Sequence, residues 1–286
     1  MPIYNIPESF LPVQSREHDF FVYDFKMTED AVNSKVNLTH NMFSFLQSGE
    51  KKVQLEGDFV EVNDKQSVLI KHGNCLMTEL LVKDEIYFCK LFFFTNKNVA
   101  DFLKKHPELI QKSDKQPTPD TPFFVIENDE FINSFAASIT SVLRLKTNIP
   151  ALLEIKFEEI MLYLSEKYGG TFIHYIQTLA SSEKNYSLKK TVEANINSNL
   201  SLAEIAFLSN MSLSTFKRHF KTEYNANPGK WLQQKRLHIA KEMLENDGKK
   251  PSEIFKQFGY NNLSNFSIAF KNEFGSSPNQ LKNRMD

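Results

Sequence analysis

The sequence predicts a multidomain α+β protein with a β-rich N-terminal part, a helical segment, and an all-α C-terminal part made of two helix-turn-helix units. Short β-type runs separated by turn residues occupy residues 20–94. Apolar residues recur at helical three- and four-residue steps from Asn128 onward. A helix-turn-helix pattern that begins near Asn199 returns about fifty residues later. Because 286 residues exceed the usual size of one hydrophobic core, we expect separate segments at residues 1–116, 117–183 and 184–286.

The β-rich part is predicted to consist of consecutive antiparallel hairpins. Polar turns such as Ser48-Gly49-Glu50 separate its runs, and a break near Lys83-Asp84-Glu85 interrupts the last one. A small β-sandwich or barrel is the expected result. The β-type runs cover residues 41–47, 51–55, 59–62, 66–70 and 78–94.

A polar, proline-rich connection, QKSDKQPTPDTP at residues 111–122, precedes two predicted amphipathic helices. Gly169-Gly170 ends the second helix. The apolar stripes of these helices either cover the sheet and each other or pair with a second copy of the chain. The first stripe consists of Ile132, Phe135, Ala136, Ile139, Val142 and Leu143, and the second of Leu153, Phe157, Ile160, Met161 and Leu164.

The first helix-turn-helix unit begins at a capping box formed by Ser201 and Glu204. A turn over residues 209–212 leads to a second short helix, in which Phe216 and Phe220 fix the buried side. A different face of that helix is therefore polar and basic. It carries Ser214, Lys217, Arg218 and Lys221.

The second unit repeats this design, with Gly259 in the turn where the first unit has Asn210. Both residue types accept the left-handed backbone conformation that a tight turn requires. Its outward positions, Ser264, Ser267, Ile268 and Lys271, are less basic. A helix from Asn227-Pro228 to about Asn246 joins the units. Nineteen residues span roughly 28 Å, close to the ~34 Å of one DNA turn.

Charge is distributed unevenly along the chain. Residues 187–286 hold 15 Lys and Arg against 9 Asp and Glu, whereas the remainder holds 19 against 26. Such asymmetry is expected when one domain meets a polyanion, although a solvated lysine-rich surface gives the same counts. Without a membrane-length apolar stretch or a signal-type N-terminus, we expect a cytoplasmic protein. Cys75 and Cys89 lack metal-ligand or CxxC spacing, so we expect buried, reduced thiols.

Residues from about Ser187 to Arg284 resemble the DNA-binding domain of the AraC/XylS family of bacterial transcription regulators. The resemblance covers about a third of the chain, and two tandem units with this joining helix are highly specific. It implies a DNA-binding transcription regulator whose N-terminal domain is a cupin-like β-barrel that senses a small molecule or a protein and helps the chain to dimerise. The residues that carry it are Arg236-Leu237, Ala240, Leu244, Gly259-Tyr260, Phe266, Phe270-Lys271 and Gly275-Ser276-Ser277-Pro278.

The resemblance also places base and phosphate contacts on the second helix of each unit. Arg218 is the first candidate for reading a base, because a guanidinium can grip guanine with two hydrogen bonds. Lys221 and Lys271 are expected to hold phosphates. Ile268 and Phe255 depart from the family pattern, so we expect the second unit to contribute less to base reading. The full predicted set is Ser214, Thr215, Lys217, Arg218, Lys221, Asn262, Ser264, Ser267, Ile268 and Lys271.

The expected partners are double-stranded promoter DNA, RNA polymerase, a second copy of the chain, and an effector that is either a small molecule or a polypeptide. A cupin enzyme with an appended DNA-binding domain is the alternative from another class. His40 and His72 stand isolated, so we expect no metal, cofactor or catalysis. The run of Phe88, Phe92, Phe93 and Phe94 fits either a core or an apolar ligand pocket.

Overall fold

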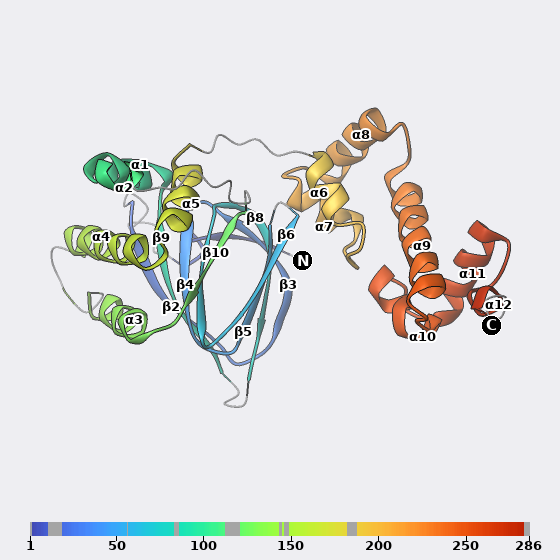
Figure 1. Ribbon diagram of the computed structural model, residues 1–286, viewed down its shortest axis with the longest axis horizontal. Coiled ribbons are helices and arrows are strands. Elements are labelled where there is room, and N and C mark those ends of the chain that lie inside the picture. Colours follow the sequence, from blue (N-terminus) through green and yellow to red (C-terminus); the bar gives the residue numbers. More distant parts are fainter. Residues whose placement is uncertain are drawn as a thin grey trace. The chain divides into compact units, whose positions relative to one another are not determined.

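The computed structural model describes residues 2–10, 19–55, 57–82, 86–111, 121–142, 145, 149–181 and 188–282. The chain divides into two compact units, Met1–Asn185 and Tyr186–Asp286 (Figure 1). The first unit is a β-sandwich covered by helices on one side, and the second is all-α. The first unit therefore includes both the β-rich part and the helical segment that the sequence analysis described separately.

Two five-stranded sheets form the sandwich in the described part of the first unit. They are open sheets, so the cupin-like fold implied by the resemblance takes the form of two layers rather than a closed barrel. The predicted β-type runs are confirmed as strands β2 to β9, but the prediction of consecutive hairpins is wrong: among these strands only β5 and β6 form a hairpin, because the other consecutive strands alternate between the two sheets. One sheet has the order β1 (Ile3–Ile6), β3 (Ala31–Leu38), β8 (Gly73–Leu80), β5 (Glu50–Leu55), β6 (Asp58–Asn63), and the other β10 (Phe123–Glu127), β7 (Gln66–Ile70), β4 (Asn41–Ser48), β9 (Tyr87–Phe94), β2 (Phe21–Met27).

The burial pattern of each strand reflects what covers its two faces. Strand β5 alternates between partly exposed and buried residues, because one face points into the sandwich and the other outward. In β4, by contrast, six consecutive residues are buried, since helices cover the outer face of its sheet. Phe93 packs inside the sandwich, while Phe92 and Phe94 pack under the helices. These phenylalanines are core residues.

The helices over this sheet are α1 (Asn96–Lys105), α2 (Pro107–Gln111), α3 (Glu130–Val142), α4 (Ile149–Tyr168) and α5 (Gly170–Ser181) (Figure 1). The predicted stripes of α3 and α4 share one core with strand residues such as Phe45 and Phe92, so they cover the sheet; Leu143 lies outside the described residues. Helices α1, α2 and α5 and strands β1 and β10 were not predicted from the sequence. The last of these places a strand inside a segment that was predicted to be helical.

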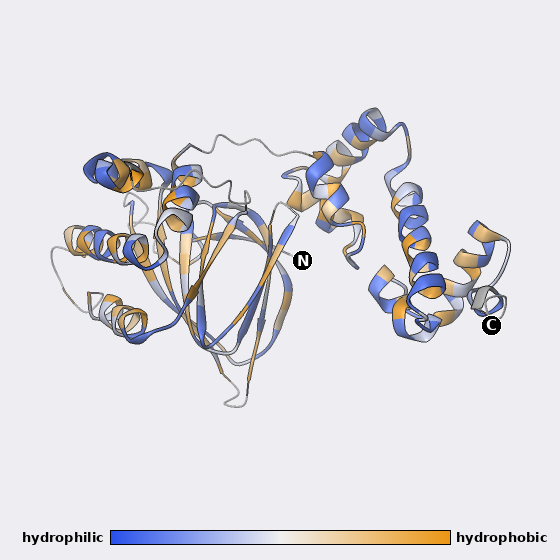
Figure 2. Cartoon of the chain, in the orientation of Figure 1, coloured by the Kyte–Doolittle hydropathy of each residue, from blue (hydrophilic) through white to orange (hydrophobic). Residues whose placement is uncertain are grey.

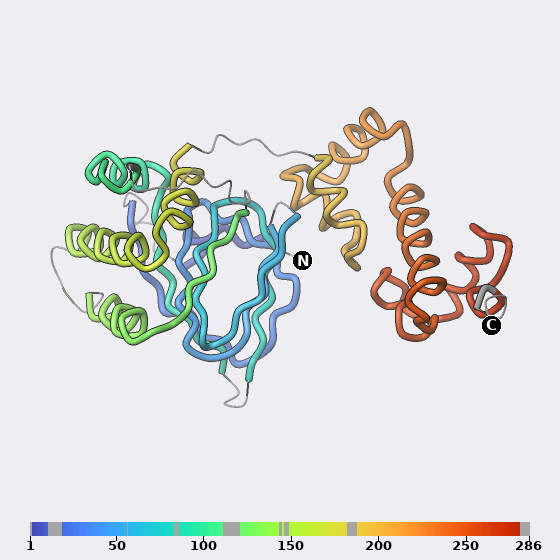
Figure 3. The backbone as a smooth tube through the Cα atoms, viewed as in Figure 1, coloured from blue at the N-terminus to red at the C-terminus, as the bar shows by residue number. Residues whose placement is uncertain are grey.

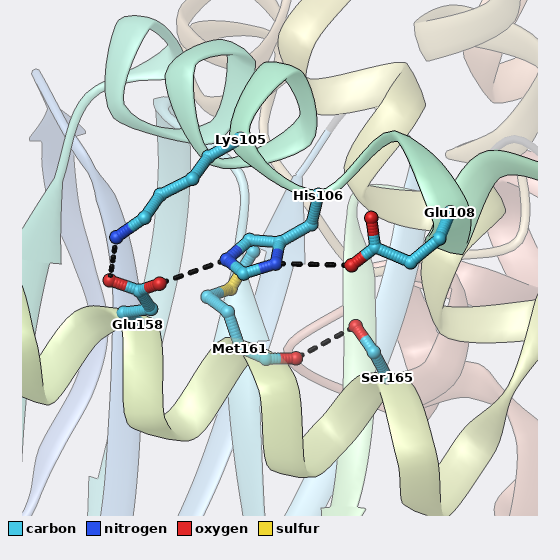
Figure 4. Close-up of polar contacts among 6 residues, drawn as sticks. All are labelled: Lys105, His106, Glu108, Glu158, Met161 and Ser165. Atoms are coloured by element: carbon cyan, nitrogen blue, oxygen red, sulfur yellow. Dashed lines mark hydrogen bonds and ion pairs between the residues drawn. The ribbon is translucent and has the colours of Figure 1, made fainter.

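Polar contacts tie α4 to the end of α1 (Figure 4). The His106 ring lies between two carboxylates, with Nε2 2.9 Å from Glu158 Oε1 and Nδ1 3.2 Å from Glu108 Oε1. Lys105 Nζ donates to the other oxygen of Glu158 at 2.6 Å. Hydrogen bonds from Lys105 and His106 lower the pKa of Glu158. This cluster fixes the helical layer at a point where apolar packing gives way to solvent.

The second unit consists of two groups of short helices joined by a long helix (Figure 3). Its C-terminal core groups residues of the joining helix α9 with Phe258, Phe266 and Phe270. The elements are α6 (Leu188–Ala194), α7 (Leu202–Leu208), α8 (Leu213–Tyr224), α9 (Pro228–Asn246), α10 (Pro251–Ile254), the 3-10 helix η2 (Phe255–Phe258), α11 (Leu263–Phe274) and α12 (Pro278–Lys282).

Among the helices in the described ranges, none is both long and apolar enough to cross a membrane. Cys75 and Cys89 are buried free thiols in the sandwich, as expected. His40 Nδ1 lies 3.0 Å from Thr39 Oγ1, and His72 Nδ1 lies 3.3 Å from Asn41 Oδ1.

Candidate nucleic-acid interface

Local capping signals set the geometry of the first helix-turn-helix unit. Ser201 accepts from the Glu204 backbone N–H, and the Glu204 carboxylate accepts from the Ser201 backbone N–H, so the predicted capping box is confirmed. Asn210 adopts φ 57° in the turn after α7. Ser212 then caps α8 by accepting from the Thr215 N–H. Short-range hydrogen bonds therefore fix the start of α7 and the start of α8, on either side of the turn.

Helix α8 has one aromatic side and one polar side. Phe216 and Phe220 are fully buried, and Phe220 packs edge-on against Trp231 of α9 at 5.4 Å between ring centres. Most of the remaining surface of α8 is hydrophilic (Figure 2). The predicted residues Ser214, Lys217, Arg218 and Lys221 are all exposed on that surface, and Thr215 is half-buried beneath them.

The exposed basic side chains of α8 have no acidic partner within the described part of the second unit. Within residues 188–282, no Asp or Glu forms an ion pair with Lys217, Arg218 or Lys221. The hydroxyls of Ser214 and Thr215, in contrast, lie 3.0 and 2.9 Å from the Ser212 hydroxyl. The three basic residues are thus available to an anionic ligand, while the two hydroxyls also help to cap the helix.

The second unit repeats the backbone geometry with a shorter first helix. Gly259 adopts φ 81° where the first unit has Asn210. Asn262 caps α11, because its Oδ1 accepts from the Asn265 N–H at 2.8 Å. After four residues of α10 the chain tightens into η2 at Phe255, which is half-buried where the matching Ala206 is fully buried. The change from α-helix to 3-10 helix therefore coincides with the position where Phe255 replaces the small Ala206 of the first unit.

The outward face of α11 is less basic than that of α8. Ser264, Ile268 and Lys271 are exposed and Ser267 is half-buried. Ile268 has 58% of its surface exposed, which is unusual for a branched apolar side chain. Asn262 serves first as a helix cap through Oδ1, so its Nδ2 is the donor that remains for another contact.

Arg236 on α9 has a structural role that its place in the family pattern did not indicate. It is 8% exposed and donates from Nε to the Ile196 carbonyl and from Nη2 to the Leu200 carbonyl, both at 2.9 Å. A Cβ on Gly259 would stand 3.5 Å from its Nη1. Burial lowers the pKa of the guanidinium. Arg236 therefore links the segment before α7 to the turn of the second unit.

A signal for this role was present in the sequence. Arg236 lies four residues after Leu232 and four before Ala240, which puts it on the buried stripe of α9. A charged residue on an apolar stripe must find buried hydrogen-bond acceptors. Backbone carbonyls in the preceding segment provide them.

Two families of known domains match the chain. The family described as ExsA N-terminal regulatory domain matches residues 41–175, within the first unit. A family described as Helix-turn-helix domain matches residues 202–284, which include both units of the candidate interface.

Similar proteins include the thermoregulatory protein LcrF of Yersinia pestis, which is 23% identical over 186 residues, 64% of this chain and 68% of that protein. The virulence regulon transcriptional activator VirF of Yersinia enterocolitica has the same identity and coverage. Among solved structures, ToxT from Vibrio cholerae bound to a methylnaphthalenyl butenoic acid covers 94% of this chain and 100% of its own, with 13% identity and a TM-score of 0.41.

Proposed function

Because the chain belongs to the AraC/XylS family of transcription regulators, we propose that α8 and α11 enter successive major grooves of promoter DNA. The chain is a sequence-specific DNA-binding regulator and not an enzyme. Arg218 reads a base with help from Lys217, and Lys221 and Lys271 hold phosphates. The proposal extends to activation of transcription, in keeping with the name of the relative VirF.

The observation that supports the proposal most strongly is the basic face of α8, which has no acidic partner among residues 188–282, together with the less basic outward face of α11. Helix α9 has 19 residues and so spans roughly 28 Å, which suits two helices about one DNA turn apart. Ser214 and Thr215 stand at the N-terminal end of α8, where backbone N–H groups favour a phosphate. Ser264, Ser267 and the Asn262 amide are weaker candidates on α11.

The test is DNA binding by the full chain and by two single variants. A genome-wide binding profile first supplies a bound sequence. We expect Arg218→Ala to reduce the preference for that sequence over unrelated DNA by about 1–3 kcal/mol, with the melting temperature unchanged, because Arg218 is exposed. The matched control is Lys104→Ala, which removes an exposed positive charge from α1 in the other unit. An Arg218→Ala protein with the wild-type footprint and affinity would refute the base-reading role.

Helix α4 supports the further proposal of a homodimer. Ile155 is 61% exposed and Leu162 is 38% exposed, and their seven-residue separation puts them on one face of the helix. If this face of one chain packs against the same face of a second chain, both side chains are removed from water. A dimer bound at a promoter would then contact RNA polymerase in the bacterial cytoplasm, on the nucleoid. The effector that controls it is either a small molecule or a protein partner.

A further inference from the structure

The interior of the sandwich contains an ion pair at positions where its strands otherwise bury apolar side chains. Lys51 on β5 and Glu79 on β8 are directly opposed cross-strand neighbours. Lys51 occupies an inward position, in alternation with Val53 and Leu55. Its Nζ donates to Glu79 Oε1 at 2.8 Å, and the two side chains are 2% and 7% exposed. Burying a pair of charges is costly, and well-packed apolar residues serve stability as well or better.

A cavity of about 270 Å³ runs between the sheets to this ion pair. Its deep wall is apolar and buried, and its mouth is formed by partly exposed residues that include Tyr4, Phe25 and Met27. An engineered apolar cavity of about 150 Å³ is enough to hold benzene. The space therefore admits a small molecule with an apolar body. The deep wall consists of Ile6, Val36, Met42, Met77 and Leu91.

The end of the cavity is polar but has no net charge. Burial favours the neutral form of Lys51, but the attraction of Glu79 outweighs it and raises the pKa of Lys51 above its ordinary value. An ammonium has three donors, and Lys51 uses one for Glu79; Met77 Sδ is a weak acceptor at 3.9 Å. The Glu79 carboxylate has further acceptor capacity. A ligand here meets one donor group and one acceptor group.

Charge balance decides which head group fits. A carboxylate would accept from Lys51 but would leave one net negative charge in a site removed from water. An ammonium would leave one net positive charge for the same reason. An uncharged group that accepts from Lys51 and donates to Glu79 satisfies both residues without net charge.

We propose that this cavity binds a neutral amphiphile, with an apolar body of about ten carbon atoms or fewer and a hydroxyl or primary amide as its head group. Such a ligand would be the effector of the first unit, and this biological role rests on the proposed regulatory function. Binding itself depends only on the cavity and on Lys51 and Glu79.

The test uses three ligands that share one tail and differ in head-group charge. Calorimetric titrations of the full chain at neutral pH with 1-octanol, octanoate and octylamine compare neutral, anionic and cationic heads. We expect 1-octanol to bind at least tenfold more tightly than either ion. Octanoate or octylamine binding as tightly as 1-octanol would overturn the proposal, and so would the absence of binding by all three.

A double variant tests the two residues without leaving a buried charge. Lys51→Met combined with Glu79→Leu gives the cavity an apolar end and should fold, because both charges are removed together. We expect it to lose at least tenfold in 1-octanol affinity. The matched control is Lys52→Met with Glu61→Leu, since that pair, 2.8 Å apart, lies on the outward face of the same sheet.

The control should keep wild-type affinity for 1-octanol. Equal losses in the double variant and the control would overturn the role of Lys51 and Glu79. Promoter binding by the wild-type chain is measured in the same preparation. If 1-octanol fails to bind while promoter DNA still binds, the ligand proposal is wrong and the DNA-binding function stands. If 1-octanol binds while promoter DNA does not, the ligand proposal stands and the DNA-binding function is wrong.

Discussion

Arg236 gives the sharpest test of how the two helix-turn-helix units are held together. Arg236→Met preserves much of the side-chain length and removes the guanidinium. The carbonyls of Ile196 and Leu200 each lose a charged donor at 2.9 Å, and such bonds contribute about 1.5–3 kcal/mol each. Because the buried guanidinium also loses its own desolvation cost, we expect a net destabilisation of about 2–4 kcal/mol. In a unit of this size that lowers the melting temperature by roughly 10–25 °C.

A spacing assay separates a positioning role from simple stability. Promoter sites are prepared with one base pair added or removed between the two half-sites, which moves one half-site by about 3.4 Å and turns it by about 35°. At a temperature where both proteins are folded, the wild type should discriminate against the altered sites. Arg236→Met should discriminate less, and Arg236→Lys, a single point charge, should be intermediate. Wild-type melting and wild-type spacing preference in Arg236→Met would refute the argument.

Three further variants address other parts of the chain. Lys271→Ala should weaken binding to all DNA sequences alike and flatten the salt dependence by about one unit of log–log slope, measured by filter binding; a loss confined to one base position would contradict it. Burial would raise the pKa of Asp129, but hydrogen bonds from Lys167 and Tyr163 outweigh it and hold the pKa at about 2. Its stabilisation is therefore complete above about pH 4 and fades as the pH falls towards 2. Asp129→Asn should accordingly lower the melting temperature at pH 7 and converge with the wild type near pH 2; a constant difference across that range would exclude this account. Ile155→Glu should reduce the molecular mass measured by light scattering from that of a dimer to that of a monomer, and an unchanged dimer would remove α4 from the interface.

Short-range signals predicted most of the second unit. The capping box of Ser201 and Glu204 and the Asn227-Pro228 start of α9 depend on residues within three or four positions, so the sequence alone reveals them. The strand runs of the sandwich were predictable for the same reason, because turn residues separate them. Their pairing was not, because most neighbouring strands in each sheet are distant in the sequence.

Long-range contacts explain the elements that were missed. Strand β10 follows a proline-rich stretch and exists because it pairs with β7, with Phe123 opposite Ile70. Helix α5 begins at Gly170, directly after the turn at Gly169 that ends α4. Glycine is a poor helix residue, so the sequence indicated only an ending there. Tertiary packing against the sheet supplies what local propensity lacks.

The polar end of the cavity was within reach of sequence reasoning but was not found. Lys51 interrupts an alternating pattern with Val53 and Leu55, and that pattern places its side chain inside the sandwich. The sequence does not give the partner, because the pairing of Lys51 with Glu79 depends on the register between β5 and β8. Arg236 is a parallel case, since its two acceptors lie 40 and 36 residues earlier in the sequence.

The two helix-turn-helix units differ where the fold leaves their residues free. Asn210 and Gly259 share a left-handed conformation, and Ser212 and Asn262 share a capping role, because the turn geometry demands them. The turn geometry does not constrain the residues on the outward faces, where the first unit has Arg218 and the second has Ile268. A branched apolar side chain can contact a thymine methyl but cannot form the paired hydrogen bonds that identify guanine. Under the proposed function, the similar turns and unequal faces of the two units lead us to expect specificity in the half-site that α8 would contact, with α11 mainly holding the duplex in register.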